Sequence, residues 1–381
     1  MASKDIRNVT RRFVLQVGFS CNARCRFCYY KESLRTGKVR DYTTLEIKSK
    51  LIEGISLGKN MIDISGGEPT IRHDIFEIIK YARDIGYKRV CLITNGIKMS
   101  NPEFCDKLIE AGMNEILFSI HSPVENDHDW LTCVKGSYKK IITALEYLGK
   151  KKGVSIRINS TISGFNYETI DKLFELLRPY DLDAINILIL NPSNETLYDS
   201  DKDIVIIDYN IVGKKVSDSI NKYKQYFKVI NIRWIPFCLM KGHEERIRTM
   251  WQKMYEDEEW DTYMNIKYNK GILAVIASLI AGSFLYPFKA PKYGKRDLYT
   301  LFNEIQTTFR GVYYYIHPKE CKICSLRKIC PGLPRDYINK LGINMTKLSP
   351  YQLGKVIEDP LYFCREYKNN FESLRLSENI K

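Results

Sequence analysis

The stretch FVLQVGFSCNARCRFC, residues 13–28, joins an apolar run directly to three cysteines. The run Phe13–Gly18 predicts a β-strand, because β-branched and aromatic residues are enriched in strands. Cys21, Cys25 and Cys28 follow it with the spacing C-x3-C-x2-C. Three thiolates this close in sequence can ligate one soft metal centre. The stretch therefore predicts a metal site on the loop after the first strand, with a zinc site or three unconnected cysteines as the alternatives.

Outward from this stretch, predicted strands and helices alternate as far as residue 190. The predicted strands are Phe13–Gly18, Met61–Ser65, Arg89–Thr94, Glu115–Ile120, Val154–Thr161 and Ala184–Leu190. The predicted helices are Leu45–Ile55, Ile75–Ile85, Pro102–Ala111, Tyr138–Leu148 and Tyr167–Leu177. Six strands separated by helices indicate βαβ units and a parallel sheet, either open and doubly wound or curled into a partial or complete barrel. In either arrangement, ligands bind at the carboxyl ends of the strands.

The alternation stops after Asn191. A helix is predicted at Asp203–Lys224 and an extra strand at Phe227–Trp234, but from Pro236 onward cysteines return without any βα pattern. We therefore expect three parts: an N-terminal extension (1–12), the domain of alternating strands and helices (13–235), and a smaller, mostly irregular or helical domain (236–381).

The composition is that of an ordinary globular protein, since 44% of the 381 residues are hydrophobic and 27% are charged. This excludes a disordered chain, and 11 cysteines are too few for a small disulfide scaffold. Lys and Arg exceed Asp and Glu by 59 to 45, a net charge of +14. Such a charge can attract nucleic acid, an anionic membrane or an acidic substrate. No run reaches the five or six like charges of a nucleic-acid tail, so solvated lysine faces explain the charge more simply.

Two segments of the sequence bear on the cellular location of the protein. The N-terminal residues MASKDIRNVTRRF contain no apolar signal-peptide core, so we expect a cytoplasmic protein whose cysteines bind metals or act in catalysis. The segment Gly271–Phe288 has no charge and lies at the lower edge of transmembrane length. Because glycine, serine and proline dilute it, we expect a helix that the protein or a partner covers, rather than one that contacts a membrane.

A second set of cysteines lies in the C-terminal part. Cys321, Cys324 and Cys330 have the spacing C-x2-C-x5-C, and Cys238 follows the extra strand. Four thiolates can close a second iron–sulfur cluster, and they can equally hold a structural zinc ion. Cys364 is the alternative to Cys238 as the fourth ligand.

The motifs that follow the strands belong together. The glycine-rich motif SGGEPT, residues 65–70, allows backbone to approach a ligand closely, although its plain alternative is a strand-to-helix turn. With the segment C-NAR-C-RF-C, Thr94-Asn95-Gly96 and Ser119-Ile120-His121, the chain resembles the radical SAM superfamily over residues 10–192. The resemblance implies a partial (β/α)6 TIM-like barrel and a [4Fe-4S] cluster on Cys21, Cys25 and Cys28. It implies that S-adenosylmethionine (SAM) is cleaved to a 5′-deoxyadenosyl radical that abstracts a substrate hydrogen.

The resemblance also implies SAM-binding residues. The glycines and the glutamate of SGGEPT would meet the methionine ammonium, two aromatic residues would lie beside the adenine, and polar strand ends would meet the ribose, the adenine or the carboxylate. Each of these polar residues could also serve the fold alone, and the Asn-Gly pair is equally a turn. The candidates are Phe27, Tyr29, Gly66, Gly67, Glu68, Asn95, Ser119, Asn159 and Asn191.

The C-terminal cysteines look like the core of the SPASM and twitch extensions that follow radical SAM barrels. The full SPASM pattern has a further cysteine four residues after the third, where this chain has Pro334. We therefore expect one auxiliary [4Fe-4S] cluster on Cys238, Cys321, Cys324 and Cys330.

The implied function is hydrogen abstraction from a peptide or protein side chain, or from a small natural-product or cofactor precursor, with electrons from a flavodoxin- or ferredoxin-like donor. Cys133, after the fourth strand, is a candidate hydrogen-atom donor, and a surface or core thiol is its plain alternative. Modification of RNA or a nucleotide is a second hypothesis, which the positive charge favours. A non-catalytic zinc-binding module is the hypothesis from another class.

Overall fold

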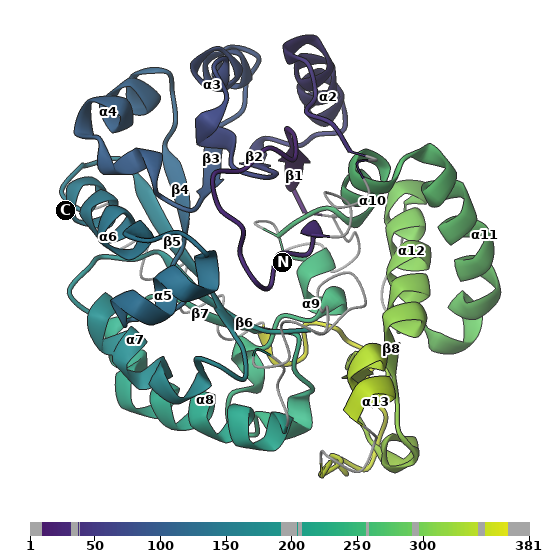
Figure 1. Cartoon of the computed structure of the whole chain (residues 1–381). Helices are drawn as coiled ribbons and strands as arrows, with labels where there is room; N and C mark the ends of the chain where they lie inside the picture. Colours follow the sequence, from purple (N-terminus) through teal and green to yellow (C-terminus); the bar gives the residue numbers. More distant parts are fainter. Residues whose placement is uncertain are drawn as a thin grey trace, which may run out of the picture.

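Seven strands run parallel in one sheet, in the order in which they occur along the chain. The strands are β1 (Arg12–Gln16), β2 (Met61–Ser65), β3 (Arg89–Thr94), β4 (Glu115–Ser119), β5 (Ser155–Ile162), β6 (Ala184–Ile189) and β7 (Ile230–Arg233). The computed structural model describes residues 10–31, 37, 39–191, 204, 208–256, 259–291, 297–341 and 347–364. In Figure 1 the strands follow an arc with helices on its outer side, so the sheet is a curled half-barrel.

The outer helices are amphipathic and bury one stripe against the sheet. In α7, for example, the buried residues Ile170, Leu173, Phe174 and Leu177 have the i, i+3, i+4, i+7 spacing of one helix face. The helices of this layer are α2 (Thr44–Ser56), α3 (Ile75–Asp84), α4 (Pro102–Glu110), α6 (Ser137–Leu148), α7 (Ile170–Leu177) and α8 (Tyr209–Tyr223). The short helix α5 (Glu125–Thr132), which follows β4, packs on α6 instead.

The predicted partial (β/α)6 barrel is confirmed, with two additions. The extra strand joins the same sheet as β7, since Ile185 of β6 pairs with Ile230 in parallel register. The helix α5 was not predicted, because its sequence ENDHDWLT offers few apolar residues for a helical stripe. Part of the helix predicted at Asp203–Lys224 lies outside the described residues.

The base of the barrel is a layer of charged side chains. On β1, β2, β4 and β5 every second residue points into the barrel, and at the base these are Arg12, Asp63, Glu115 and Arg157. Arg12 pairs with Asp63 and, at 2.9 Å, with Glu115, while Arg157 pairs with the same two carboxylates at 3.0 and 2.5 Å. Trp260 donates from its indole nitrogen to Asp63 at 2.7 Å. This layer closes the lower end, so a substrate must meet the barrel at the carboxyl ends of the strands.

The segment after β7 covers both free edges of the half-barrel. Ile247 forms a parallel bridge with Ile232 of β7, and Trp260 forms one with Arg12 of β1. Strand edges are otherwise open to unwanted pairing, so these bridges protect them. The elements that follow β7 are α9 (Met250–Met254), α10 (Thr262–Lys270), α11 (Ile272–Lys289), α12 (Leu298–Tyr314), β8 (Tyr315–Ile316), β9 (Leu333–Pro334) and α13 (Arg335–Leu341).

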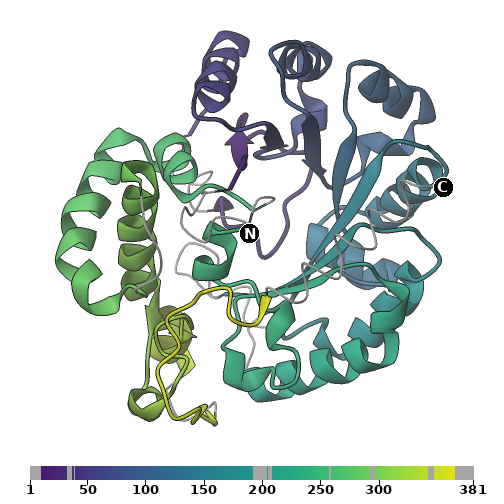
Figure 2. The same cartoon turned by 180° about the vertical axis from the view of Figure 1, so that it is seen from behind.

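Figures 1 and 2 place α10, α11 and α12 on the side of the molecule opposite α4 and α6. The helix predicted from the apolar segment is present as α11, and it is long and apolar enough to cross a membrane by length and composition alone. Of its residues, only Val275, Ser278 and Gly282 are buried. Of the two expectations for this helix, cover by the protein itself is therefore wrong for the part of the chain that the structure describes, because a single neighbour, α12, provides most of its contacts. Cover by a partner stays a prediction.

Candidate active site

The cysteine triplet lies on the loop after β1 and is anchored on the end of α5. The backbone amides of Arg24 and Arg26 donate to the carbonyls of Thr132 and Leu131 at 3.1 and 2.9 Å. Cys133 comes directly after this anchor, in a left-handed conformation with φ of 56°, and its side chain is exposed. The structure thus places the candidate hydrogen-atom donor at the surface beside the cysteine loop, close enough to Cys25 to act on its pKa.

The three thiols of Cys21, Cys25 and Cys28 lie close together in a poorly solvated environment. Burial raises the pKa of Cys21 to about 11. Burial also raises the pKa of Cys25, and the nearby Cys28 and Cys21 raise it further. Three buried thiolates repel one another unless cations lie between them, so this set suits a centre that carries several metal ions.

The glycine motif after β2 fixes the cysteine loop through backbone hydrogen bonds. The amides of Gly67 and Glu68 donate to the carbonyls of Gly18 and Ser20, both at 2.9 Å. Gly66 has a φ of 142°, and a Cβ on Gly67 would lie 2.1 Å from the Ser20 oxygen. Only glycine permits this approach, so the motif positions the loop that carries the thiols.

Glu68 and Asn95 connect the loops after β2 and β3. The Glu68 carboxylate is buried and accepts hydrogen bonds from Thr70 N at 3.1 Å, Thr70 Oγ1 at 2.6 Å, Thr94 Oγ1 at 2.7 Å and Asn95 N at 2.8 Å. Burial raises the pKa of Glu68, while these donors oppose that shift. The Asn95 amide donates to the Asn22 side chain at 2.8 Å, beside Cys21.

The aromatic candidates differ in their surroundings. Phe27 is half-buried, and its ring meets His121 edge-on with a centroid distance of 4.6 Å. Burial lowers the pKa of His121 well below its usual range, so the imidazole beside Phe27 is neutral at pH 7. Tyr29 is 55% exposed and donates to the hydroxyl of Tyr30 at 2.8 Å.

Above the charged base, three asparagine side chains on neighbouring strands are joined in a row by hydrogen bonds. We call Asn159, Asn186 and Asn231 the amide ladder. Ser119 of β4 pairs with Asn159 of β5 in the sheet register. The amide of Asn186 donates to Asn159 at 2.9 Å, and the amide of Asn231 donates to Asn186 at 3.0 Å. The sequence analysis singled out only Asn159 of this ladder. The signal for the other two was an asparagine between apolar residues of a strand, an inward position by the period of two.

Gln16 was also missed. It ends β1 on the inward face, is buried, and neither its amide nitrogen nor its oxygen has a hydrogen-bond partner among the described residues. Buried amides are rarely left so, which makes this side chain a candidate contact for a ligand in the barrel. At the other side, Asn191 after β6 lies close enough to the buried Tyr315 of β8 to act on the pKa of its hydroxyl. The candidate at the end of β6 therefore touches the C-terminal part of the chain.

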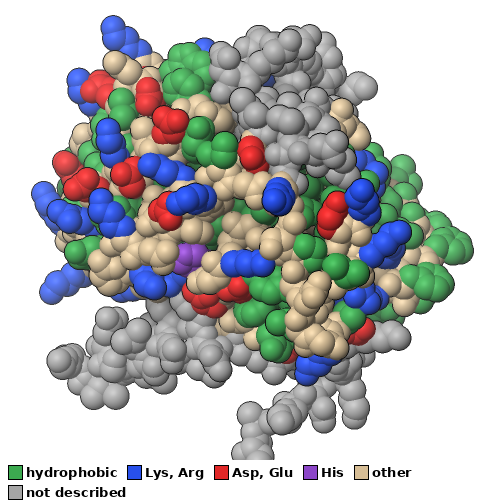
Figure 3. All heavy atoms as spheres, turned by 90° about the horizontal axis from the view of Figure 1, so that it is seen from below, with side chains coloured by type: hydrophobic (Ala, Val, Ile, Leu, Met, Phe, Trp, Pro, Cys, Tyr) green, Lys and Arg blue, Asp and Glu red, His purple; other side chains and the backbone are tan. Residues whose placement is uncertain are grey.

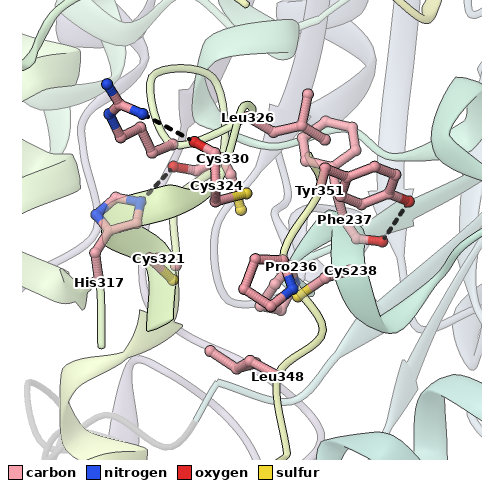
Figure 4. Close-up of a pocket in the computed structure, with 13 residues that line it drawn as sticks. Pro236, Phe237, Cys238, His317, Cys321, Cys324, Leu326, Cys330, Leu348 and Tyr351 are labelled. Atoms are coloured by element: carbon pink, nitrogen blue, oxygen red, sulfur yellow. Dashed lines mark hydrogen bonds between the residues drawn. The ribbon is translucent and has the colours of Figure 1, made fainter. Parts of the chain in front are cut away.

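Four further cysteines line one pocket in the C-terminal part of the chain. Cys238 approaches the pocket from one side, and Cys321, Cys324 and Cys330 approach it from the other (Figure 4). Pro236, Phe237, Leu326, Leu348 and Tyr351 provide an apolar wall. Burial raises the pKa of Cys321 to about 12, so a thiolate here also needs cations.

Cys364 lies elsewhere. It is buried, and its sulfur accepts a hydrogen bond from Arg248 at 3.3 Å instead of facing the pocket. Among the described residues, no three His, Cys, Asp or Glu side chains lie close enough to share a single metal ion. Thiols spaced around a pocket suit a cluster, in which each iron takes one thiolate.

A half-barrel of parallel strands with three thiols on the loop after its first strand defines a class of enzymes that hold an iron–sulfur cluster at the carboxyl edge of the sheet. The family pattern of the radical SAM superfamily matches residues 15–231, which include the cysteine triplet and SGGEPT. The chain belongs to the radical SAM superfamily. It is therefore a radical SAM enzyme, and enzymes of this family use a [4Fe-4S] cluster and SAM.

Individual relatives are more distant. The chain is 33% identical over 186 residues to the AdoMet-dependent heme synthase of Methanosarcina barkeri, covering 49% of this chain and 52% of that protein. It is 26% identical over 172 residues to a probable GTP 3′,8-cyclase of Sulfurisphaera tokodaii, covering 45% and 53%. The chain thus spans about half the length of the curated relatives it matches. Among solved structures, it is similar to SuiB of Streptococcus suis, with a TM-score of 0.49, 14% identity and coverage of 76% and 77%.

Proposed function

We propose that this radical SAM enzyme uses a second, auxiliary [4Fe-4S] cluster held by Cys238, Cys321, Cys324 and Cys330. The observation that carries the proposal is the convergence of four thiols, from segments more than 80 residues apart in sequence, on one apolar-walled pocket. A structural zinc ion on the same thiols is the second candidate, because four cysteines are also a common zinc site.

The first cluster would be held by Cys21, Cys25 and Cys28, whose three thiolates leave one iron free for SAM. When bound, the cluster and SAM supply a 5′-deoxyadenosyl radical, which removes a hydrogen atom from the substrate. The chain itself fixes the thiol loop through Gly67 and Glu68, and it excludes water from the base of the barrel with the charged layer. Phe27, Tyr29, Gly66, Asn95, Ser119, Asn159 and Asn191 remain our candidates for contacts with SAM.

We further propose that the substrate is a small cofactor precursor. The names of the curated relatives, a heme synthase and a GTP cyclase, support a small molecule. The amide ladder supports a polar one, since Asn159, Asn186 and Asn231 offer donors and acceptors inside the barrel. A peptide, which the sequence analysis put first, is the alternative that the experiment must separate. A flavodoxin- or ferredoxin-like protein would supply the electron.

The cluster proposal is tested by iron, sulfide and zinc analysis after anaerobic reconstitution, with 5′-deoxyadenosine measured after addition of SAM and dithionite. Two clusters give about eight irons and eight sulfides per chain. A content of about four irons and one zinc per chain would show instead that the four C-terminal thiols hold a zinc ion.

The substrate proposal is tested by adding fractions of a cell extract to the reconstituted enzyme. We expect the low-molecular-mass filtrate to accelerate 5′-deoxyadenosine formation. We also expect one small molecule in the filtrate to be consumed during the reaction. Acceleration only by the peptide and protein fraction would show that the small-molecule assignment is wrong.

A further inference from the structure

The helix α11 presents a line of exposed apolar side chains that nothing in the proposed reaction uses. Their exposed fractions lie between 47% and 78%. They recur about every fourth residue, which places them on one face of the helix. We call them the apolar stripe: Ile272, Leu273, Ile276, Ile280, Phe284 and Phe288.

The opposite face of α11 is fixed to the protein. Val275, Ser278 and Gly282 are buried, and a Cβ on Gly282 would lie 2.5 Å from the carbonyl oxygen of Ile305 in α12. Near the C-terminal end, Lys328 donates to the carbonyls of residues 288 and 290 at 2.5 and 3.4 Å. The helix is therefore held along its length, with one face available over about 27 Å.

The charged residues nearest to the two ends of α11 in sequence are positive. No charged residue occurs between Gly271 and Phe288, whereas Lys270 and Lys289 are exposed immediately beyond its two ends. The sequence continues with Lys292, Lys295 and Arg296, which lie outside the described residues. In Figure 3, hydrophobic side chains gather at the edge of the molecule on the side where Figure 1 places α11, with Lys and Arg side chains next to them.

We propose that the apolar stripe binds this enzyme to the surface of an anionic membrane, with α11 lying flat in the interface. A helix with exposed apolar side chains along one face and cations at its ends fits lipid acyl chains and their phosphates at the same time. The membrane is a better match than a second copy of the chain, because two copies would bring lysines against lysines and a net charge of +14 against +14.

A membrane surface also matches the shape of the stripe, because a single row of protruding side chains can insert into a flat bilayer, whereas a peptide ligand would need a groove. Because α12 holds the buried face, α11 contacts the bilayer without crossing it. The proposal reverses the sequence-based expectation that this segment avoids membranes, and the reason is its exposure, which the sequence did not show. It does not depend on the proposed substrate or on the auxiliary cluster.

The test is co-sedimentation of the reconstituted enzyme with vesicles of phosphatidylcholine alone and with vesicles that also contain phosphatidylglycerol. We expect binding to the anionic vesicles, and we expect it to fall about tenfold or more in the variant I276S/I280S/F284S. The matched control is I211S/Y226S, which changes two side chains of similar exposure, 55% and 50%, away from α11. The control should bind like the unchanged enzyme.

A second variant, K270Q/K289Q, keeps the stripe and removes the flanking charges, so it should weaken binding to the anionic vesicles while leaving circular dichroism and the melting temperature unchanged. Failure of the unchanged enzyme to bind either vesicle would overturn the proposal. So would a concentration-dependent dimer that the stripe variant abolishes, since that result would assign the stripe to a second copy of the chain.

Discussion

At the scale of single residues, the motifs after β2 and β3 are joined by hydrogen bonds to each other and to the cysteine loop. Glu68 receives hydrogen bonds from Thr70, Thr94 and Asn95, and the amide of Gly67 donates to the loop that leads to the cysteines. The sequence motifs predict these residues as contacts for SAM. In the structure their hydrogen bonds also fix the loops after β2 and β3 relative to each other. A substitution here therefore changes the thiol loop as well as any contact with SAM.

Gly67→Ala tests the loop-holding role. The new Cβ would lie 2.1 Å from the Ser20 oxygen, so the loop must shift, at a cost of about 1–3 kcal/mol in the free energy of unfolding. We expect reduced iron loading after reconstitution and a lower urea midpoint. Gly311→Ala is the matched control, because its Cβ would meet only Met250 at 3.6 Å and the position lies in the last turn of α12, where alanine favours the helix. Equal iron loading in both variants would contradict the role of Gly67.

Cys25→Ala tests the first cluster. Removing one of three thiolates should abolish 5′-deoxyadenosine formation and lower the iron content from about eight to about four per chain. Cys133→Ala is its control, because Cys133 is exposed and follows the same loop anchor. This control should keep all its iron and cleave SAM at the rate of the unchanged enzyme. Normal SAM cleavage by Cys25→Ala would refute the assignment of the triplet.

At the scale of elements, the strands carry two different inward layers. The base is ionic, with Arg12, Asp63, Glu115 and Arg157, and the layer above it is an amide ladder. The period of two along each strand predicts which residues point inward. It does not predict their partners, because the partners come from strands that are distant in sequence and meet only when the sheet curls.

Asp63 gives this base a defined pH dependence. Burial alone would raise the pKa of Asp63, but Arg12 and Arg157 outweigh it and lower the pKa from 3.8 to about 2. The ionised form is thus favoured in the folded state, so the stabilisation is complete above about pH 4 and is lost as the pH falls towards 2. We expect a loss on the order of 2 kcal/mol, measured as the urea midpoint of the protein between these values.

Asp63→Asn is the comparison for that titration. It should remove this part of the acid dependence, and it should lower stability at neutral pH by about 3–5 kcal/mol, because two buried arginines lose a charged partner. An unchanged acid dependence in the variant would mean that other carboxylates control the transition.

At the scale of the whole molecule, the chain brings its middle and its C-terminal part together around the second set of thiols. Cys238 stands shortly after β7, whereas Cys321, Cys324 and Cys330 come after the four helices α9 to α12. Asn191, which follows β6, lies close to Tyr315 of the same C-terminal part. The C-terminal part, which provides three of the pocket's thiols, therefore also lies near the carboxyl end of β6.

Cys324→Ala is expected to lose about four irons while SAM cleavage continues, since the first cluster is untouched. Product formation should fall, because the auxiliary cluster would exchange an electron with the substrate or anchor it. Cys364→Ala is the matched control, because this thiol is buried but lies outside the pocket, and it should keep about eight irons. Loss of iron from the control, with none from Cys324→Ala, would move the fourth ligand to Cys364 and remove Cys324 from the set.

The sequence by itself determined the half-barrel, the loop that carries the cysteine triplet, and the family. These depend on local patterns: a period of two or 3.6 along a segment, a fixed cysteine spacing, and glycines that allow close backbone approach. Only the tertiary structure decided that Cys238 faces the other three thiols and Cys364 does not, that Asn186 and Asn231 extend the ladder from Asn159, and that one face of α11 is uncovered. Each of these is a relation between segments far apart in the chain, and burial or pairing at such distances is set by how the elements pack rather than by the residues next to them in sequence.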